Sequence, residues 1–260
     1  MSINQKYKLF KRRLGRTLIG RNPFDLAYYF CKGVGLEVGA RNNPYPFGSG
    51  CKVFYADIGE ESKIEDILKN GFRLGSYLGK KSFAKVDYVL RAPKYAFDLI
   101  NDASFDFVYS DNVLEHTPNP IFALIEQLRV TKVGGFVYAV IPNKNFTFDK
   151  QRKSTASKVL VDKYLADIFE YEIDEALDVI RNTVDFPITF SDSDAEMAYA
   201  REMISVADGS YHFHVFEIQN TVEMLNYICA ATGATLDYFS GPPGKHIHFA
   251  LRKNIQFPVP

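Results

Sequence analysis

The first half of the chain alternates short apolar runs with segments of helical periodicity. Five of these runs have the length and composition of buried strands, at 35–39, 52–58, 86–90, 105–110 and 136–141. Between the last two, apolar residues at steps of three and four predict a helix, with Asn119 as its N-cap, Pro120 in its first turn and Gly134-Gly135 as its stop. Strands that alternate with helices indicate a parallel sheet covered by helices.

The second half adds one clear helix and two more strands. The helix is predicted from about Thr221 to Thr232, with Gly233 as its stop. Two strands at 235–240 and 246–252 flank the turn Gly-Pro-Pro-Gly, and so short a link predicts an antiparallel pair. The pattern therefore predicts an α/β fold: a mostly parallel seven-stranded sheet with helices on both faces and an antiparallel C-terminal strand.

A long segment separates the fifth strand from the helix at Thr221. Its length of about eighty residues exceeds that of an ordinary connection, and 157–182 and 192–207 have an acidic, helical character. We therefore predict a basic N-terminal helical arm at 1–32 and one domain at 33–260. Within that domain 144–216 is a largely helical insertion, either a lid on the acceptor side of a pocket or a solvated helical face.

Charge changes the picture mainly at the N-terminus. The chain of 260 residues has no net charge, with 31 basic and 31 acidic residues, but 1–24 carries seven basic side chains and no acidic one. The charge and hydrophobic pattern of this arm predicts an amphipathic helix. The helix would pack on its own domain, or contact an anionic acceptor or the inner face of a membrane. We expect no transmembrane segment and no secretory signal, and three scattered cysteines favour the cytoplasm. The absence of net positive charge disfavours a nucleic-acid partner.

Small and acidic residues end the first two predicted strands. Glu37 and Gly39 end the first strand, and Asp57 ends the second. The carboxyl ends of parallel strands form a ligand-binding edge, where an acid on the second strand can bind a ribose. A dinucleotide site should show G-x-G-x-x-G after the first strand, whereas here only Gly39 follows it. One glycine and one acid suit a ligand with an ammonium group and a ribose but no diphosphate, which describes S-adenosylmethionine (SAM).

Several motifs carry a family resemblance. They are Gly-Leu-Glu-Val-Gly-Ala-Arg at 35–41, Asp57, the run from Ser104 to His116 with Pro118 and Pro120, and the segments 128–135 and 139–143. In order and spacing they resemble the class I SAM-dependent methyltransferases. Within that superfamily, the segments 43–46, 146–152 and 212–216 resemble a bacterial group associated with surface-polysaccharide biosynthesis. The resemblance implies a Rossmann-like sheet, SAM as cofactor and methyl transfer as the reaction.

The resemblance also implies a set of cofactor-binding residues at the carboxyl ends of the first four strands: Glu37, Gly39, Ala40, Arg41, Asp57, Ile58, Asp87, Tyr88, Asp111 and Asn112. The first four would line the methionine end of SAM and Asp57 would bind its ribose. Ile58, Asp87 and Tyr88 would contact the adenine. One departure from the family pattern is that Ala40-Arg41 stand where further glycines are common.

A hydroxyl acceptor must lose its proton during methyl transfer, so the acceptor side of the site needs a general base or a metal ion. His212 and His214 return the chain to the rim of the sheet, where Glu115 and His116 are also expected. These four residues are candidate catalytic groups and candidate ligands of a divalent metal ion. Methyltransferases that act on ribose or catechol-like hydroxyls are similar, with Glu-x-x-Glu-His and a distant His, although Asn112 replaces the first Glu here. An imidazole base, a metal site and structural hydrogen bonding remain alternatives.

Two further residues are candidates for acceptor recognition. Asp149 and Arg152 are expected on an exposed loop, with an ordinary surface ion pair as the alternative. The second His-x-His pair, His246 and His248, is expected to consist of ordinary half-buried strand residues.

The sequence thus predicts a SAM-dependent O-methyltransferase. Its predicted acceptor is a sugar or sugar-linked group of a surface glycan. Alternatives are another small hydroxylated or phosphorylated metabolite, RNA, or no reaction at all, as in a SAM-binding partner of a glycan-assembly complex.

Overall fold

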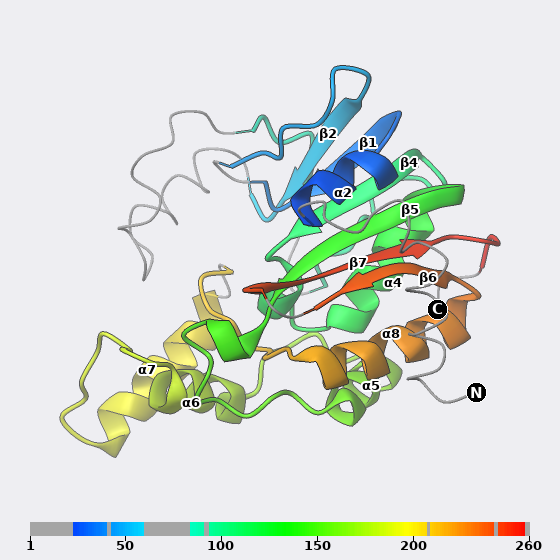
Figure 1. The fold of residues 1–260 in the computed structure, drawn as a ribbon. Helices are drawn as coiled ribbons and strands as arrows, with labels where there is room; N and C mark the ends of the chain where they lie inside the picture. Colours follow the sequence, from blue (N-terminus) through cyan, green and yellow to red (C-terminus); the bar gives the residue numbers. More distant parts are fainter. Residues whose placement is uncertain are drawn as a thin grey trace.

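The computed structural model describes residues 23–40, 43–59, 84–90, 94–206, 209–241 and 244–257. At its centre is one seven-stranded sheet with the strand order β3-β2-β1-β4-β5-β7-β6 (Figure 1). The strands are β1 (Val34–Val38), β2 (Lys52–Asp57), β3 (Tyr88–Val89), β4 (Phe105–Asp111), β5 (Thr131–Pro142), β6 (Thr235–Ser240) and β7 (His246–Arg252). The first five pair in parallel, whereas β7 runs antiparallel to both β5 and β6. The predicted fold class is confirmed.

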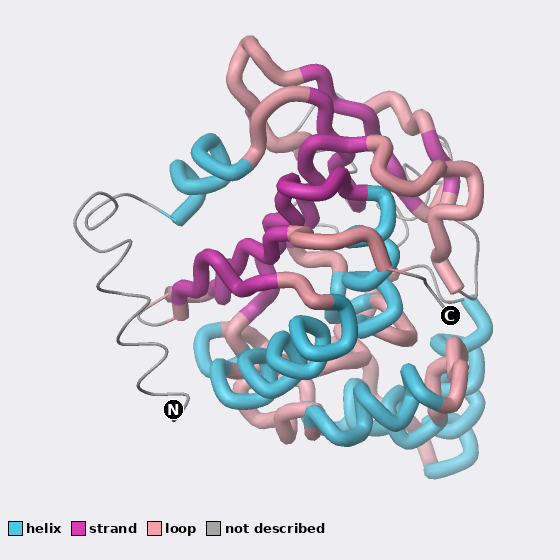
Figure 2. The backbone as a smooth tube through the Cα atoms, turned by 90° about the vertical axis from the view of Figure 1, so that its right-hand side faces the viewer, coloured by secondary structure: helices cyan, strands magenta, loops and turns pink. Residues whose placement is uncertain are grey.

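Helices cover both faces of this sheet (Figure 2). On one face α4 (Pro120–Val130) and α8 (Ile218–Thr232) pack against the strands, and α5 (Ser157–Leu165) packs against these two helices. On the other face α2 (Pro23–Phe30) buries Leu26, Ala27 and Phe30 against aromatic side chains of β4 and β5. The sheet is therefore sandwiched between two apolar layers, and the loops at the strand ends remain available for a site.

The end of α4 differs from its prediction. Asn119 is the N-cap of α4 as expected, and its side chain accepts a hydrogen bond from Phe122 N. The predicted stop at Gly134-Gly135 is wrong, because α4 ends at Val130 and β5 begins at the next residue. A Cβ on Gly135 would lie 2.4 Å from the backbone oxygen of Asp106 in β4. This glycine therefore serves the close approach of two strands and does not end a helix.

The second predicted helix begins earlier than expected. α8 starts at Ile218 because a capping box at Glu217 and Asn220 closes its first turn, with Glu217 N donating to Asn220 Oδ1 over 2.8 Å. It ends where predicted, and Gly233 has the left-handed φ of +71° that favours glycine.

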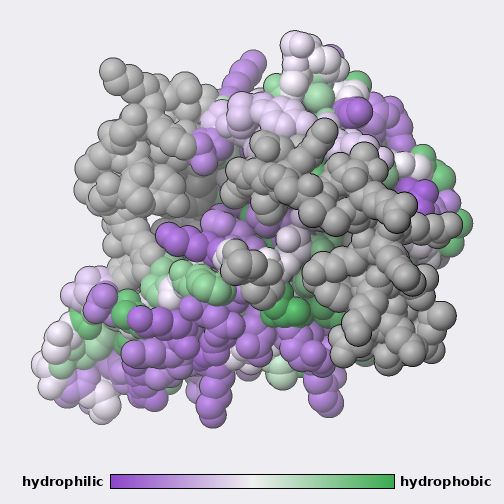
Figure 3. Space-filling view, in the orientation of Figure 1, coloured by the Kyte–Doolittle hydropathy of each residue, from purple (hydrophilic) through white to green (hydrophobic). Residues whose placement is uncertain are grey.

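The region between β5 and α8 is largely helical. The stretch predicted at 157–182 forms two helices, α5 and α6 (Ile173–Asn182), and α7 (Ser193–Val206) follows. Helices α6 and α7 share a small core of their own and extend beyond one end of the sheet (Figure 1). Hydrophilic residues predominate along the lower edge of this face, over α5 and α6 (Figure 3). That this region acts as a lid stays a prediction.

The N-terminal arm lies outside the described residues as far as position 22. Among the residues that are described, no helix has the length and apolar character needed to cross a membrane.

Candidate active site

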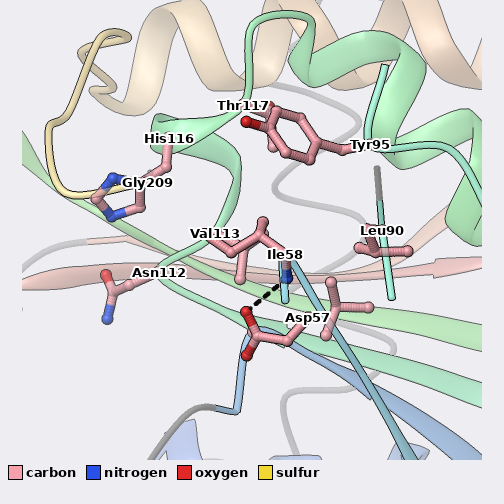
Figure 4. Close-up of a pocket in the computed structure, with 11 residues that line it drawn as sticks. Asp57, Ile58, Leu90, Tyr95, Asn112, Val113, His116, Thr117 and Gly209 are labelled. Atoms are coloured by element: carbon pink, nitrogen blue, oxygen red, sulfur yellow. Dashed lines mark hydrogen bonds between the residues drawn. The ribbon is translucent and has the colours of Figure 1, made fainter. Parts of the chain in front are cut away.

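A pocket lies at the carboxyl ends of β1 and β2 (Figure 4). The two strands are parallel neighbours, so Gly39 after β1 and Asp57 at the end of β2 meet at the same edge of the sheet. The residues that follow β4 close the opposite wall, and they include Asn112, Val113 and His116. Leu90, directly after β3, also lines the cavity, so the cavity joins residues from the ends of four strands that are far apart in the sequence.

Gly39 and Asp57 shape the floor of this pocket. Gly39 has a φ of +72°, and a Cβ at this position would lie 2.6 Å from Val113 Cγ2. Only glycine fits here, for backbone conformation and for space. Asp57 is 4% exposed, and its Oδ1 accepts a hydrogen bond from Ile58 N over 2.8 Å. These two residues lie where the sequence predicts them.

Two further carboxyl groups lie beside the end of β1. Glu37 is buried and accepts a hydrogen bond from Tyr45 N over 2.9 Å. Burial raises the pKa of Glu37 to about 8; the hydrogen bond from Tyr45 opposes this shift, and the carboxylates of Asp111 and Asp57 add to it. Burial likewise raises the pKa of Asp111 to about 6, against a hydrogen bond from the Tyr109 hydroxyl. Three acidic groups at one edge favour a positively charged ligand.

The other predicted cofactor residues have different positions. Ala40 is buried next to Gly39, and Asn112 lines the pocket with a left-handed φ of +52°. Arg41 lies outside the described residues.

Asp87 and Tyr88, the predicted adenine contacts, do not line this pocket, whereas Leu90 does; that they contact the adenine stays a prediction. Asp87 is exposed and accepts a hydrogen bond from Tyr55 N, whereas Tyr88 packs against Phe54 and Phe105. The sequence analysis also missed other lining residues, namely Tyr95, Val113, Thr117 and Gly209. Val113 and Thr117 lie in or next to the motif that ends at His116, whereas Tyr95 and Gly209 belong to no motif of the sequence.

Glu115, His116 and His212 meet at the rim of this pocket, and we call them the histidine cluster. Glu115 and His116 belong to the short helix η2 (Leu114–His116) after β4, and His212 lies between α7 and α8. Nε2 of His116 and Nε2 of His212 each lie 3.8 Å from Oε1 of Glu115. A backbone hydrogen bond from His214 N to Glu115 O holds the two segments together. His116 also lines the pocket, so the cluster adjoins Gly39 and Asp57, two of the predicted cofactor-binding residues.

Hydrogen bonds at the other ring nitrogens set the imidazole tautomers. Nδ1 of His116 lies 2.7 Å from Tyr211 O, and Nδ1 of His212 lies 2.7 Å from Oδ2 of Asp149. Burial raises the pKa of Asp149, but the hydrogen bond and charge of His212 and the charge of Arg152 outweigh it and lower that pKa overall. A carbonyl and an ionised carboxylate can only accept. When either imidazole is neutral, its proton is therefore on Nδ1 and its lone pair on Nε2, on the side of Glu115.

The expectation that Asp149 and Arg152 lie on an exposed loop is wrong. Each is 2% exposed, because α6 and the segment around His212 cover them. Arg152 donates to Asp149 over 2.9 Å, to Asp178 over 2.7 Å and to the backbone oxygen of His212 over 2.5 Å. These residues position the His212 ring and its backbone.

His214 also lies outside the histidine cluster, contrary to prediction. It is 1% exposed, and its Nε2 lies 3.2 Å from Pro118 O. Burial lowers its pKa to about 4. His248 of the second pair is buried on β7 and lies 3.3 Å from the Tyr138 hydroxyl.

Comparisons with known proteins give one family match over part of the chain and several similar solved structures. Residues 79–139 match a family model described as a methyltransferase domain. Similar solved structures include SAM-dependent methyltransferases from Aquifex aeolicus (13% identity, 96% of this chain and 98% of that one, TM-score 0.44) and Methanosarcina mazei (18%, 90% and 98%, 0.44). Another is an S-adenosylmethionine-dependent methyltransferase from Mesorhizobium loti (11%, 88% and 95%, 0.46). At these values the structural likeness says nothing about substrate or reaction.

A search of curated proteins gave no match. The family match covers β3, β4, α4 and the Glu115-His116 pair, so the segment from 79 to 139 is similar to a methyltransferase domain in the part of the chain that builds one wall of the pocket.

Proposed function

We propose that this protein is a SAM-dependent methyltransferase that acts on a hydroxyl group. The observation that carries the proposal is one pocket in which Gly39 and Asp57 share a cavity with His116 of the histidine cluster. The predicted cofactor-binding residues thus adjoin imidazoles that can activate the hydroxyl group of an acceptor. The family match over 79–139 supports methyl transfer as the reaction.

The residues of the site fit the parts of SAM. The buried carboxylate of Asp57 can accept hydrogen bonds from the ribose diol, and Ile58, Leu90 and Val113 offer apolar surface to the adenine. Glu37 and Asp111 line a second pocket beside the end of β1, and a bound ammonium or sulfonium group would favour their ionised form.

The reaction itself requires little covalent chemistry from the protein. The acceptor oxygen attacks the methyl carbon, the C–S bond breaks as the C–O bond forms, and the demethylated cofactor S-adenosylhomocysteine leaves. The chain must align the two reactants and exclude water. It must also deal with the hydroxyl proton. An imidazole with a lone pair on Nε2 can take that proton, or it can bind a cation that lowers the pKa of the hydroxyl.

The proposed acceptor is a sugar or sugar-linked group of a surface glycan. Support comes from the resemblance of the segments 146–152 and 212–216 to the surface-polysaccharide group. The second of these contains His212 of the histidine cluster, so part of the resemblance falls on the acceptor side of the site.

Two measurements test the proposal in sequence. Isothermal titration of the full chain with SAM should give one binding site. Methyl transfer is then assayed from radiolabelled SAM to a panel of nucleotide sugars, oligosaccharides and small hydroxylated metabolites. Absence of SAM binding refutes the function, whereas binding without transfer to any member would favour a non-catalytic SAM-binding partner.

Asp57→Ala is expected to weaken SAM binding about ten-fold or more, since it removes a charged hydrogen-bond acceptor for the ribose. Titration calorimetry measures the change. The matched control is Asp98→Ala, which removes an exposed carboxylate that does not line the pocket. Unchanged SAM affinity in Asp57→Ala would show that Asp57 does not bind the ribose.

SAM affinity is expected to increase with pH up to about 8. The pKa of Glu37 in the ligand-free protein is about 8, so below that pH its carboxyl group is mostly protonated. A cation that binds beside it must expel that proton, which costs up to about ten-fold in affinity per pH unit below the pKa. Titrations at pH 6.5, 7.2 and 8.0 should show this slope, and Glu37→Gln should flatten it. A slope of equal size in Glu37→Gln would assign the effect to another group.

A further inference from the structure

We infer that the histidine cluster binds a divalent transition-metal ion through Oε1 of Glu115 and Nε2 of His116 and His212. The three residues come from two segments almost a hundred residues apart, and one ligand atom of each lies within 4.8 Å of the others. Two imidazoles and one carboxylate form a mixed N₂O donor set. Such a set suits zinc, manganese or iron better than magnesium or calcium, which prefer oxygen ligands.

The distances are close to those of a metal centre. Zinc binds nitrogen and carboxylate oxygen at about 2.0–2.2 Å, so its tetrahedral ligands lie about 3.4 Å from one another. The two His–Glu separations here are 3.8 Å. Small side-chain rotations therefore suffice to close the cluster around an ion.

The surroundings prepare both histidines to be ligands. A metal-binding histidine usually donates its second ring N–H to a carboxylate or a backbone carbonyl, which fixes its orientation and tautomer. Both arrangements occur here, His212 with Asp149 and His116 with Tyr211 O, each over 2.7 Å. Asp149 is held in turn by the buried Arg152. These hydrogen bonds orient both rings so that Nε2 of each lies on the side of Glu115.

The position of the cluster indicates what the ion would do. Three protein ligands leave coordination positions for other groups, as in catalytic rather than structural zinc sites. His116 lines the same pocket as Gly39 and Asp57, so those positions adjoin the methyl donor in the proposed function. The acceptor class this geometry fits is a sugar hydroxyl, or a vicinal pair of hydroxyls. The ion would lower the pKa of the bound hydroxyl, whose proton leaves to water as the C–O bond forms.

The catalytic role of the ion rests on the proposed function, but metal binding itself does not. The experiment is therefore a titration of the chelator-treated full chain, without a histidine tag, with Zn²⁺ and with Mn²⁺. We expect one equivalent of at least one of these ions to bind with a dissociation constant of about 10 μM or lower. His212→Ala and Glu115→Gln should each weaken binding more than ten-fold. His246→Ala, on β7 and outside the cluster, should bind like the wild type.

The same samples are titrated with SAM, and circular dichroism checks that each variant is folded. His212 is partly exposed, so His212→Ala keeps the test valid if Glu115→Gln does not fold. No binding of either ion by the wild type, or equal binding by the wild type and folded His212→Ala, would overturn the metal site. Metal binding without SAM binding would refute the proposed function and support the metal site. SAM binding without metal binding would refute the metal site and leave the proposed function intact.

Discussion

Replacing His212 with alanine is expected to lower methyl transfer about 100-fold or more while SAM affinity stays at its wild-type value. Nε2 of this ring faces Glu115 at the rim of the pocket, and its Nδ1 is held by Asp149. Whether Nε2 takes the hydroxyl proton or holds a metal ion, its loss removes the group that activates the acceptor. His212 does not line the pocket beside Gly39 and Asp57, so the cofactor end should keep its shape.

The measurement is single-turnover transfer from SAM to the acceptor that the panel identifies, together with a SAM titration of the same protein. The matched control is His246→Ala, from the other His-x-His pair, which should retain transfer. Equal loss of SAM affinity and of transfer in His212→Ala would show that this residue supports the cofactor site instead. Full activity would remove the histidine cluster from the reaction.

The second large effect concerns stability. Arg152→Ala is expected to lower the free energy of unfolding by about 3–5 kcal/mol, because it leaves buried charge without its partner. The Arg152 side chain is 1% exposed and pairs with Asp149, which is 3% exposed, and with the less buried Asp178. It also donates to the backbone oxygen of His212, so its loss frees the segment that carries the cluster. Thermal unfolding should show a melting temperature lower by about 6–20 °C.

Lys158→Ala provides the control for this prediction. Lys158 pairs with Asp162 on the surface of α5, and its side chain is 82% exposed. Solvent screens such a pair, so the melting temperature should stay close to that of the wild type. If Arg152→Ala melted like Lys158→Ala, the buried ion pairs would contribute little to the fold.

The sequence predicted the number and order of the strands, although β3 has only Tyr88–Val89 of the predicted 86–90 and β5 begins at Thr131 instead of 136. The runs at 52–58 and 105–110 are apolar and bounded by polar residues, and both form strands within one residue of the predicted ends. The helix end at Val130 could not be predicted in the same way. Gly134 and Gly135 resemble a helix stop, whereas their role depends on how close β5 passes to β4, which is a property of the packed sheet.

In the candidate site, too, some residues could be predicted from the sequence and others only from the structure. Gly39 and Asp57 were predictable because the carboxyl ends of neighbouring parallel strands must meet. Glu115, His116 and His212 were predicted to lie near one rim, but so was His214, and only the structure separates them. His214 follows His212 by two residues, yet it packs against Pro118 with its ring fully buried.

By itself, the sequence determined the parallel sheet, the order of its elements and the acidic, glycine-containing edge at β1 and β2. Hydrophobic periodicity and the residues at strand ends are local properties, so they can be recognised in the sequence alone. Only the tertiary structure decided that Asp149 and Arg152 are buried supports of His212, and that two histidines and one glutamate converge. Those contacts join residues 60 to 100 positions apart, and their partners depend on how the region between β5 and α8 folds back over the strand ends.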